Sequence, residues 1–369
     1  MLPFHQEVAP ARHLPRWRRR NRTMPTIGGT AATTTFGTNA QVRTARIVEI
    51  DFVKGTLVLI MVLYHWINYF IGLDWGGYRY LRFLTPSFIC LTGFLIGRVY
   101  LQRYTYDDRR LHARLVWRGI KLLALFVGLN LLVEYTVGGR LRLHGAPLAW
   151  FIQTAEEVFL YGSPRAAFDI LVSIAYFLLL TPIVLTVSKH FKLPLWLIAA
   201  MAVMGMVVAD YQGESNPILE MLSVALLGLA AGARGIAGPQ SMRAMSSVFV
   251  AYGLYIVATA AWNIPFVLQV VGVCVSLLML HVGATVVGTR GFVQRLVVRL
   301  GEYSLLSYIA QIVMLQLLFR MLRGTPLHGI SLLVPFLIAV LAIIALAELC
   351  AFARQRSPMT NRAYLLVFG

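Results

Sequence analysis

Residues 51–65 place an acid, a base and an imidazole in an apolar stretch that is long enough to enter a bilayer. The three groups are Asp51, Lys54 and His65. At about 100° per residue on a helix, Lys54 and His65 differ by about 20°, and Asp51 lies about 60° from Lys54. Asn68 follows His65 by three positions. These residues predict a polar stripe along one face of a membrane helix, where ionisable groups are expensive and are usually retained for function.

His65 is the candidate for proton transfer. It lies roughly 21 Å along the helix axis from Asp51, at about 1.5 Å per residue, which predicts an imidazole deep in the membrane. Imidazole titrates near neutral pH and can take a proton from a hydroxyl as that hydroxyl attacks a thioester. A histidine that only donates a hydrogen bond to a neighbouring helix is an equally good interpretation of the residue alone. Asp51 and Lys54 on the same helix favour the functional interpretation, although an ion pair at a helix end stabilises little by itself.

The surrounding sequence is typical of a polytopic membrane protein. Its 369 residues are 58% hydrophobic and 13% charged, and the mean hydropathy is +0.71, outside the range of soluble domains. The apolar runs predict about ten spans, each near the roughly 20 residues that a bilayer core requires. The predicted spans are 52–72, 80–101, 115–136, 166–188, 193–210, 217–233, 245–262, 265–287, 303–322 and 330–353. The predicted fold class is therefore an all-α transmembrane helical bundle.

The basic residues predict the orientation of this bundle. A net charge of +18 would suggest nucleic acid in a soluble chain, but here the arginines alternate between connections, so no nucleic acid partner is expected. They crowd the segment before the first span, the connections after the second and eighth spans, and the end of the chain. Both termini are therefore expected on the cytoplasmic side of the cell inner membrane, with 137–165 as the largest outer loop. Cys90, Cys274 and Cys350 lie in different spans, which predicts neither a disulfide framework nor a metal site.

The chain divides into three predicted regions. Residues 1–44 are expected to be a disordered basic cytoplasmic tail, 45–353 the transmembrane domain and 354–369 a cytoplasmic C-terminal tail. No cleavable signal peptide is expected, because the basic run at 12–22 is followed by a polar stretch. Met24 opens that polar stretch and is the expected natural start.

Two further groups of side chains are candidates for binding. Basic residues near the cytoplasmic ends of the first three spans fit an anchoring role, but guanidinium groups also suit the phosphates of a donor such as coenzyme A. The candidate donor-binding residues are Arg46, Arg98, Arg103, Arg114, Arg118 and Lys121. Polar and aromatic groups in or beside the outer connections suit carbohydrate hydroxyls and rings, although a solvated loop has a similar composition. The candidate acceptor-binding residues are Asn68, Glu134, Trp150 and Asp169.

Several stretches resemble the transmembrane acyltransferase superfamily, which includes the acyltransferase-3 family, the OpgC-like glucan succinyltransferases and the heparan-glucosaminide acetyltransferases. The pattern Arg46-x4-Asp51-x2-Lys54-Gly55, followed by His65, resembles the opening helix of that superfamily. The other similar stretches are 87–94, with Thr92 for the usual serine of "fxxSGf"; 300–308, similar to "LGxxSLxxY"; and 169–182, similar to "DILPLY" with Val172 for the proline.

The resemblance covers about residues 43–350 and implies acyl transfer from cytoplasmic acyl-coenzyme A to a hydroxyl, often on a glycan. His65 matches the catalytic histidine, acting as a base or as a covalent acyl relay, and both roles stay open. Arg46, Asp51 and Lys54 match the groups that order that helix and the donor site. Gln311 stands where many acyltransferase-3 members have a histidine, so their acceptor specificity does not transfer to this chain.

Two other interpretations remain open. In a proton-coupled secondary transporter, Asp51, Lys54 and His65 would form a relay. Such transporters often contain repeated halves, and the sequence has no second copy of this pattern. A purely structural membrane protein would leave the polar stripe unexplained. For the acyltransferase, acetyl and succinyl groups are both compatible with the sequence.

Overall fold

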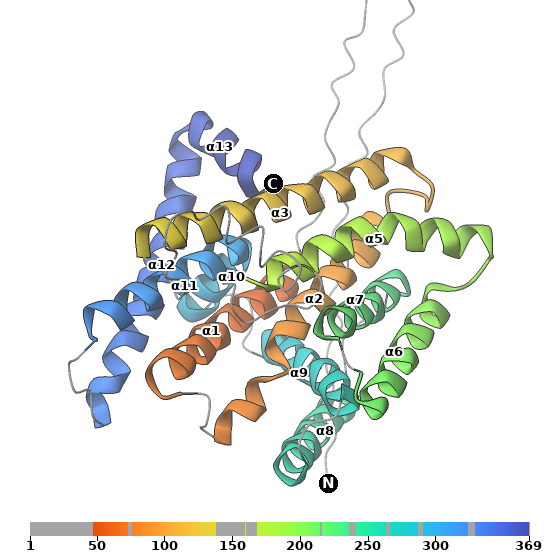
Figure 1. The fold of residues 1–369 in the computed structure, drawn as a ribbon, viewed down its shortest axis with the longest axis horizontal. Coiled ribbons are helices and arrows are strands. Elements are labelled where there is room, and N and C mark those ends of the chain that lie inside the picture. The colour runs from red at the N-terminus through yellow and green to blue at the C-terminus, as the bar shows by residue number, and fades with distance from the viewer. Residues whose placement is uncertain are drawn as a thin grey trace, which may run out of the picture. The chain divides into compact units, whose positions relative to one another are not determined.

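The computed structural model describes residues 47–72, 76–137, 159, 168–214, 216–235, 241–262, 266–286, 291–323 and 329–368. The predicted tail 1–44, and all of the predicted outer loop 137–165 except residues 137 and 159, lie outside this part of the chain. In the described ranges all regular secondary structure is helical (Figure 1).

Twelve α-helices follow one another along the described ranges, with three shorter helical turns between them. The α-helices are α1 (Val48–Phe70), α2 (Leu84–Leu95), α3 (Arg109–Val137), α5 (Ile170–His190), α6 (Leu195–Gln212), α7 (Pro217–Ala233), α8 (Met242–Ala261), α9 (Phe266–Val286), α10 (Phe292–Glu302), α11 (Ser304–Met321), α12 (Leu333–Arg356) and α13 (Pro358–Phe368). The turns are η1 (Gly76–Leu81), η2 (Ile96–Tyr100) and η3 (Gly329–Leu332), and η2 continues α2 directly.

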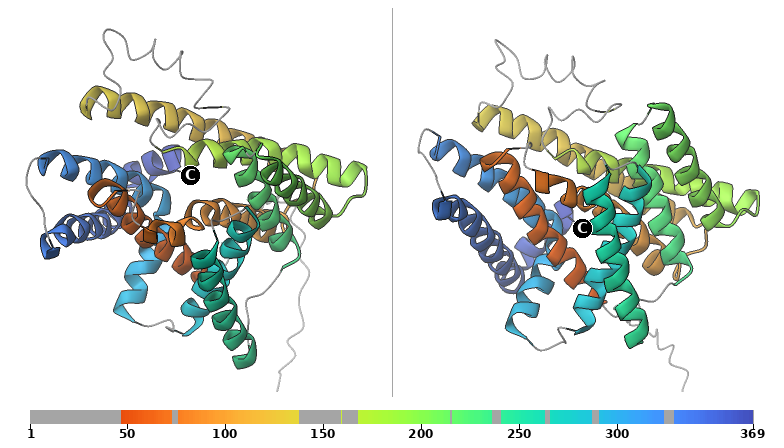
Figure 2. Two further views of the ribbon diagram at one scale, coloured as in Figure 1. Left: turned by 60° about the horizontal axis from the view of Figure 1, so that its bottom comes forward. Right: turned by 90° about the horizontal axis from the view of Figure 1, so that it is seen from below.

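The helices confirm the predicted fold class. In the described ranges, 9 helices are long and apolar enough to cross a membrane, and each coincides with a predicted span. The remaining predicted span, 217–233, coincides with α7, which has 17 residues and is therefore about 25 Å long. Large apolar side chains face outward, as on α8, where Phe249, Val250, Leu254 and Val257 are exposed. Figure 2 shows α8 beside α9, its partner in an antiparallel pair.

Glycines bring α2 and α7 into backbone contact. A Cβ atom added at Gly93 would lie 2.1 Å from the Ala225 carbonyl oxygen, and one added at Gly228 would lie 1.9 Å from the Cys90 carbonyl oxygen. The same holds at Gly97, one turn after Gly93. Small residues spaced by four positions allow this approach between membrane helices. Gly93 and Gly97 thus let the backbone of α2 and η2 lie against α7.

A similar contact fixes the start of α1 against α10. A Cβ atom at Gly55 would lie 1.9 Å from the Val297 carbonyl oxygen, and one at Gly301 would lie 1.7 Å from the Asp51 carbonyl oxygen. The sequence predicts only a basic connection after the eighth span, at 288–302, whereas the structure has a helix, α10, in this segment. The buried residues of α10 recur with helical spacing, so the segment is an amphipathic helix that supports the polar start of α1.

Candidate functional site

Asp51 and Lys54 form an ion pair at the start of α1. Lys54 Nζ lies 2.6 Å from Asp51 Oδ1, one helical turn away. Asp51 is only 5% exposed, and its backbone carbonyl lies against Gly301 of α10. Asp51 lies in the first turn of α1, where a negative charge also interacts favourably with the helix dipole. The two residues therefore meet as the sequence predicted, and the pair compensates the Lys54 charge locally.

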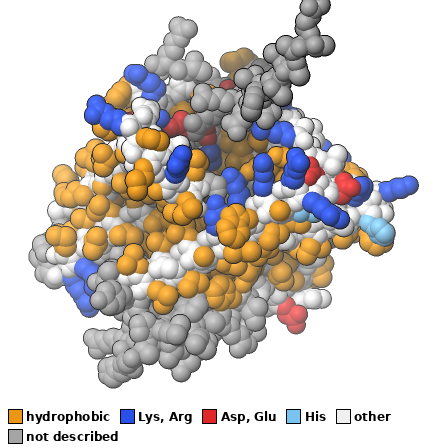
Figure 3. Space-filling model, turned by 90° about the horizontal axis from the view of Figure 1, so that it is seen from above, with side chains coloured by type: hydrophobic (Ala, Val, Ile, Leu, Met, Phe, Trp, Pro, Cys, Tyr) orange, Lys and Arg blue, Asp and Glu red, His pale blue; other side chains and the backbone are white. Residues whose placement is uncertain are grey.

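Lys54 also lines a cavity of about 440 Å³ between α1, α2, α3, α5 and α11. Its polar lining comes from three cations and several hydroxyl groups, and its remaining walls are aliphatic or aromatic. The polar lining residues are Lys54, Thr92, Tyr100, Arg118, Lys121, Ser304 and Tyr308. Figure 3 shows basic side chains gathered beside a broad hydrophobic surface on the face of the molecule that carries α3.

Arg118 and Lys121 bring positive charge from α3 to this cavity. Arg118 donates a hydrogen bond to the Tyr100 hydroxyl and lies over the Tyr100 ring, 5.7 Å from its centroid. Lys121 Nζ donates to the Leu366 carbonyl oxygen at 3.4 Å. Among the described residues that line the cavity there is no Asp or Glu. The Arg118 hydrogen bond to a neutral hydroxyl leaves its charge in place, so the cavity is a suitable binding site for an anion.

Three of the other predicted donor residues do not line the cavity. Arg114 donates to the Tyr104 hydroxyl and lies over the Tyr104 ring, Arg98 lies against Gly235, and Arg103 is exposed. Arg46 lies outside the described residues. Of the six predicted donor residues, the structure thus brings Arg118 and Lys121 together at one site.

His65 lies on α1 at some distance from the cavity. It is half-buried, and its ring packs edge-on against the Tyr64 ring with 5.2 Å between the centroids. Eleven positions separate it from Lys54, which corresponds to roughly 16 Å along the helix axis. His65 does not line the cavity. Asn68, one turn later, is also half-buried.

Hydrogen bonds hold the second half of α1 in place around His65. Trp66 Nε1 donates to the Leu332 carbonyl oxygen at 2.9 Å, which ties α1 to η3. The Gln316 side-chain amide donates to the Tyr69 hydroxyl at 3.0 Å, which ties α1 to α11. Both contacts follow His65 in sequence, within four positions, and tie this part of α1 to its neighbours.

Asp169 stands at the start of α5, next to the cavity wall. Its carboxylate accepts a hydrogen bond from the Ile170 backbone N–H at 2.8 Å and so caps the helix. The preceding residue, Phe168, has a backbone φ angle of 63°. Its ring packs against the Tyr308 ring, with 6.3 Å between the ring centroids. Ile170 and Tyr308 both line the cavity, so Asp169 is close to its edge. The Glu134 side chain and Trp150 lie outside the described residues.

The helix α13 closes one side of this cavity, which the sequence did not predict. Residues 354–369 were expected to form a tail, but α12 extends to Arg356 and α13 follows, with Val367 and Phe368 lining the cavity. A helix start was readable from the sequence. Ser357 Oγ accepts a hydrogen bond from the Thr360 backbone N–H at 3.3 Å, and Pro358 occupies the first helical position.

Arg354 anchors α13 to the bundle. Its Nε donates to Asn361 Oδ1 at 3.0 Å, and its guanidinium carbon lies 4.1 Å from the centroid of the Tyr364 ring. Another of its nitrogens donates to the Tyr303 hydroxyl at 3.2 Å. Burial raises the pKa of Tyr364 to about 12, so this phenol is neutral at physiological pH. The contacts keep the last turn of α13 at the cavity.

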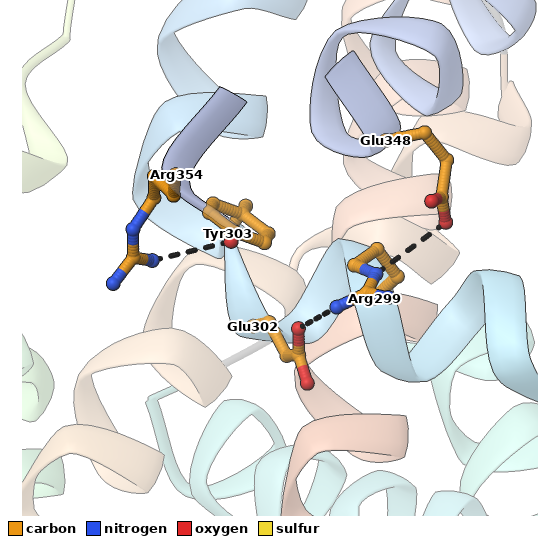
Figure 4. A network of polar contacts seen from close by, with 5 residues as sticks. All are labelled: Arg299, Glu302, Tyr303, Glu348 and Arg354. Carbon is orange, nitrogen blue, oxygen red and sulfur yellow. Dashed lines mark hydrogen bonds and ion pairs between the residues drawn. The ribbon is translucent and has the colours of Figure 1, made fainter. Parts of the chain in front are cut away.

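The polar contacts of Arg354 belong to a network that joins α10 and the following residue, Tyr303, to α12 (Figure 4). Arg299 Nη1 lies 2.8 Å from Glu302 Oε2, and Arg299 Nε lies 3.5 Å from Glu348 Oε1. Burial acts to lower the pKa of Arg299, but the hydrogen bond and charge of Glu302 outweigh it and raise that pKa. Because its charge is shared by two carboxylates, Arg299 is a structural cation rather than a phosphate-binding one.

Comparison of the chain with known protein families, curated proteins and solved structures finds no match. The function is therefore argued from the residues of the site itself. Two features carry the argument: the cationic cavity beside Lys54 and the histidine further along the same helix.

Proposed function

We propose that this multi-pass membrane protein is an O-acyltransferase that moves an acetyl or succinyl group from cytoplasmic acyl-coenzyme A to a hydroxyl of a glycan or another cell-envelope acceptor. The observation that carries the proposal is the 440 Å³ cavity in which Lys54 of α1 meets Arg118 and Lys121 of α3. Its volume falls in the range of small-molecule sites, about 300–1,000 Å³. An anionic donor with an apolar portion fits this combination of charges and walls.

The donor phosphates are assigned to the cationic part of the cavity. Arg118 has a guanidinium that is exposed at the rim, and its existing partner is the neutral hydroxyl of Tyr100. Lys121 lies one turn further along α3 and lines the same space. Asp51 holds Lys54 in position at the inner wall through their ion pair. With both termini on the cytoplasmic side, as the arginine distribution predicts, this rim faces the compartment that contains coenzyme A.

His65 is assigned as the catalytic group. It takes the proton of the acceptor hydroxyl while the oxygen attacks the thioester carbonyl, the carbon–sulfur bond breaks, and the proton passes to the leaving thiolate. An acyl-His65 intermediate is the alternative route and uses the same residue. A positioned base contributes about 10²–10⁴ in rate. Since His65 is roughly 16 Å from Lys54 along α1, the donor must lie extended, with phosphates at one end and thioester at the other.

The acceptor hydroxyl is assigned to contacts with Asp169 and Asn68, two of the predicted acceptor-binding residues. Asp169 lies beside the cavity wall at the start of α5, and Asn68 follows His65 by one turn. The Asp169 carboxylate can accept hydrogen bonds from sugar hydroxyls, and the Asn68 amide can both donate and accept them. Glu134 and Trp150 remain predicted contributors from the outer connection.

The proposal is tested by a transfer assay on protein reconstituted in nanodiscs. Acetyl- and succinyl-coenzyme A are supplied with a mixture of envelope glycans, and release of free thiol is measured for the wild type, His65→Ala and His190→Ala. His190 is the matched control because it is exposed at the end of α5. We expect His65→Ala to lose 10²-fold or more of the rate and His190→Ala to keep it. Equal rates in the two variants, or proton flux into proteoliposomes without any thiol release, would refute the acyltransferase assignment, and the latter would favour a proton relay.

A further inference from the structure

Two polar side chains of α11 are buried without a hydrogen-bond partner among the described residues. Gln311 is 0% exposed, and neither its amide oxygen nor its amide nitrogen has a partner. Ser307 lies one turn earlier on the same face, and its hydroxyl is also buried and unpaired. An unpaired polar group is expensive within a bilayer, where water cannot replace the lost hydrogen bond. This place on α11 is therefore suited to bind a polar group of a ligand.

The face of α11 that carries Gln311 begins in the cationic cavity. Ser304 and Tyr308 line that cavity, and Gln311 does not. Gln311 follows Tyr308 by three positions, which corresponds to about 4.5 Å along the helix and about 60° around it. Gln311 thus lies beyond the cavity, in the direction in which α11 continues.

Gln311 and His65 lie at nearly the same depth on α11 and α1. The start of α1 packs against α10, just before α11 begins. Near their other ends, the Gln316 amide donates to the Tyr69 hydroxyl at 3.0 Å. The two helices therefore run in the same direction. His65 precedes Tyr69 by about 6 Å along α1, and Gln311 precedes Gln316 by about 7.5 Å along α11.

The two residues also belong to the surfaces on which α1 and α11 face each other. Val58 and Val62 of α1 and Leu315 of α11 are fully buried in one hydrophobic cluster. His65 follows Val58 by seven positions and Val62 by three, so it shares their face of α1. Gln311 precedes Leu315 by four positions, so it shares that face of α11. Gln311 is thereby directed toward the side of α1 that carries His65.

We propose that Gln311 is the hydrogen-bond donor for the carbonyl oxygen of the acyl group that is transferred at His65. This inference rests on the proposed function and deepens it, because it names a second catalytic group. As the acceptor oxygen bonds to the carbonyl carbon, His65 takes the hydroxyl proton and negative charge develops on the carbonyl oxygen. The Gln311 amide donates to that oxygen. When the carbon–oxygen double bond forms again, the carbon–sulfur bond breaks and the leaving thiolate takes the proton from His65.

The test compares Gln311→Met with Gln294→Met in the full chain in nanodiscs. Methionine is close to glutamine in length and volume, but it cannot donate the hydrogen bond. Gln294 of α10 is the matched control, because it is 4% exposed and has an unpaired amide oxygen but does not line the cavity. Three quantities are measured: the kcat of thiol release from acetyl- and succinyl-coenzyme A, the Kd for coenzyme A and the unfolding temperature.

We expect Gln311→Met to lose about 10²-fold to 10³-fold in kcat, which is the usual effect of removing one donor to a developing oxyanion. Its Kd for coenzyme A should stay at the wild-type value, because Gln311 lies outside the cavity. Its unfolding temperature should equal or exceed that of the wild type, since the substitution removes an unpaired buried amide. Gln294→Met should keep the wild-type kcat.

The outcomes separate the inference from the function on which it rests. Thiol release by Gln311→Met at the wild-type kcat would overturn the inference and leave the acyltransferase proposal standing. A lower kcat together with weaker coenzyme A binding or a lower unfolding temperature would also overturn it, because Gln311 would then act on the structure. Equal losses of kcat in the two variants would do the same. Absence of thiol release by the wild type from either thioester would overturn the proposed function and the inference with it.

Discussion

Substitution of Gly301 by alanine should loosen the contact that positions the polar start of α1. The added Cβ atom would lie 1.7 Å from the Asp51 carbonyl oxygen, whereas real contacts of this kind stay beyond 3.0 Å. The two helices must therefore separate by about 1.3 Å, because a backbone atom cannot rotate away as a side chain can. The matched control is Gly128→Ala on α3, where an added Cβ atom meets nothing within 4 Å.

The expected loss of stability follows from two opposing effects. Overpacking at a fixed backbone contact costs about 3 kcal/mol, the upper end of the usual range. Alanine in place of glycine in a helix raises the free energy of unfolding by up to about 1 kcal/mol, so a net loss of stability of about 2 kcal/mol remains. At about 1.3 °C per kcal/mol for a chain of 369 residues, Gly301→Ala should unfold about 2–3 °C below the wild type. Gly128→Ala should unfold at or slightly above the wild-type temperature.

The assay is thermal unfolding followed by tryptophan fluorescence in detergent micelles. The reasoning is refuted if Gly301→Ala and Gly128→Ala unfold at the same temperature. A second check is Gly55→Ala, which meets the Val297 carbonyl oxygen at 1.9 Å and should behave as Gly301→Ala does. Agreement of these two variants would locate the effect in the α1–α10 contact rather than in α10 alone.

Three further predictions concern the ion pair, the end of α13 and the loop after η2. Lys54→Met removes the ion pair between Lys54 and the Asp51 carboxylate and should lower the free energy of unfolding by about 1.5–3 kcal/mol in chemical denaturation, and a double variant with Asp51→Asn should recover most of this loss. Phe368→Ala removes a lining side chain, so the Kd for coenzyme A should change in equilibrium binding, and an unchanged Kd would separate α13 from the site. The hydrogen bond from Lys189 lowers the pKa of Asp107, so this contact stabilises the fold above the usual aspartate pKa and is lost as pH falls through the lowered pKa. Titration of the Asp107 carboxyl by NMR should show a higher pKa in Lys189→Ala, and an unchanged value would contradict the contact.

The sequence predicted most of the fold because membrane spans depend on length and hydrophobicity alone. Each predicted span corresponds to a helix, and the role of Gly93 and Gly97 in packing was readable from their spacing. The helix α10 was not anticipated, because its 11 residues are too few to span a bilayer and its arginines resemble a loop. The pattern that indicates α10 is the helical spacing of its buried residues, which a search for continuous apolar runs does not detect.

The site was predicted less completely, because contacts between distant segments are not encoded in local spacing. The Asp51–Lys54 pair lies within one helix and was predictable from the turn of that helix. Which arginines line the cavity together with Lys54 depends on the packing of α3 against α5, and Arg118 lines it whereas Arg103 and Arg114 do not. Phe368 lines the cavity because the C-terminal segment folds back and packs against Arg354. The sequence of the first three spans does not indicate this contact.

The most direct test of the account is equilibrium binding of coenzyme A to the protein in phosphatidylcholine nanodiscs, with Arg118→Ala and Arg103→Ala compared with the wild type. Both residues are exposed arginines that the sequence predicts as donor-binding residues, but of the two only Arg118 lines the cavity. A charge-assisted hydrogen bond contributes about 1.5–3 kcal/mol, so Arg118→Ala should weaken binding by about 10-fold to 100-fold. Arg103→Ala should bind as the wild type does. Equal effects of the two substitutions, or saturable binding that neither changes, would contradict the assignment of this cavity as the donor site.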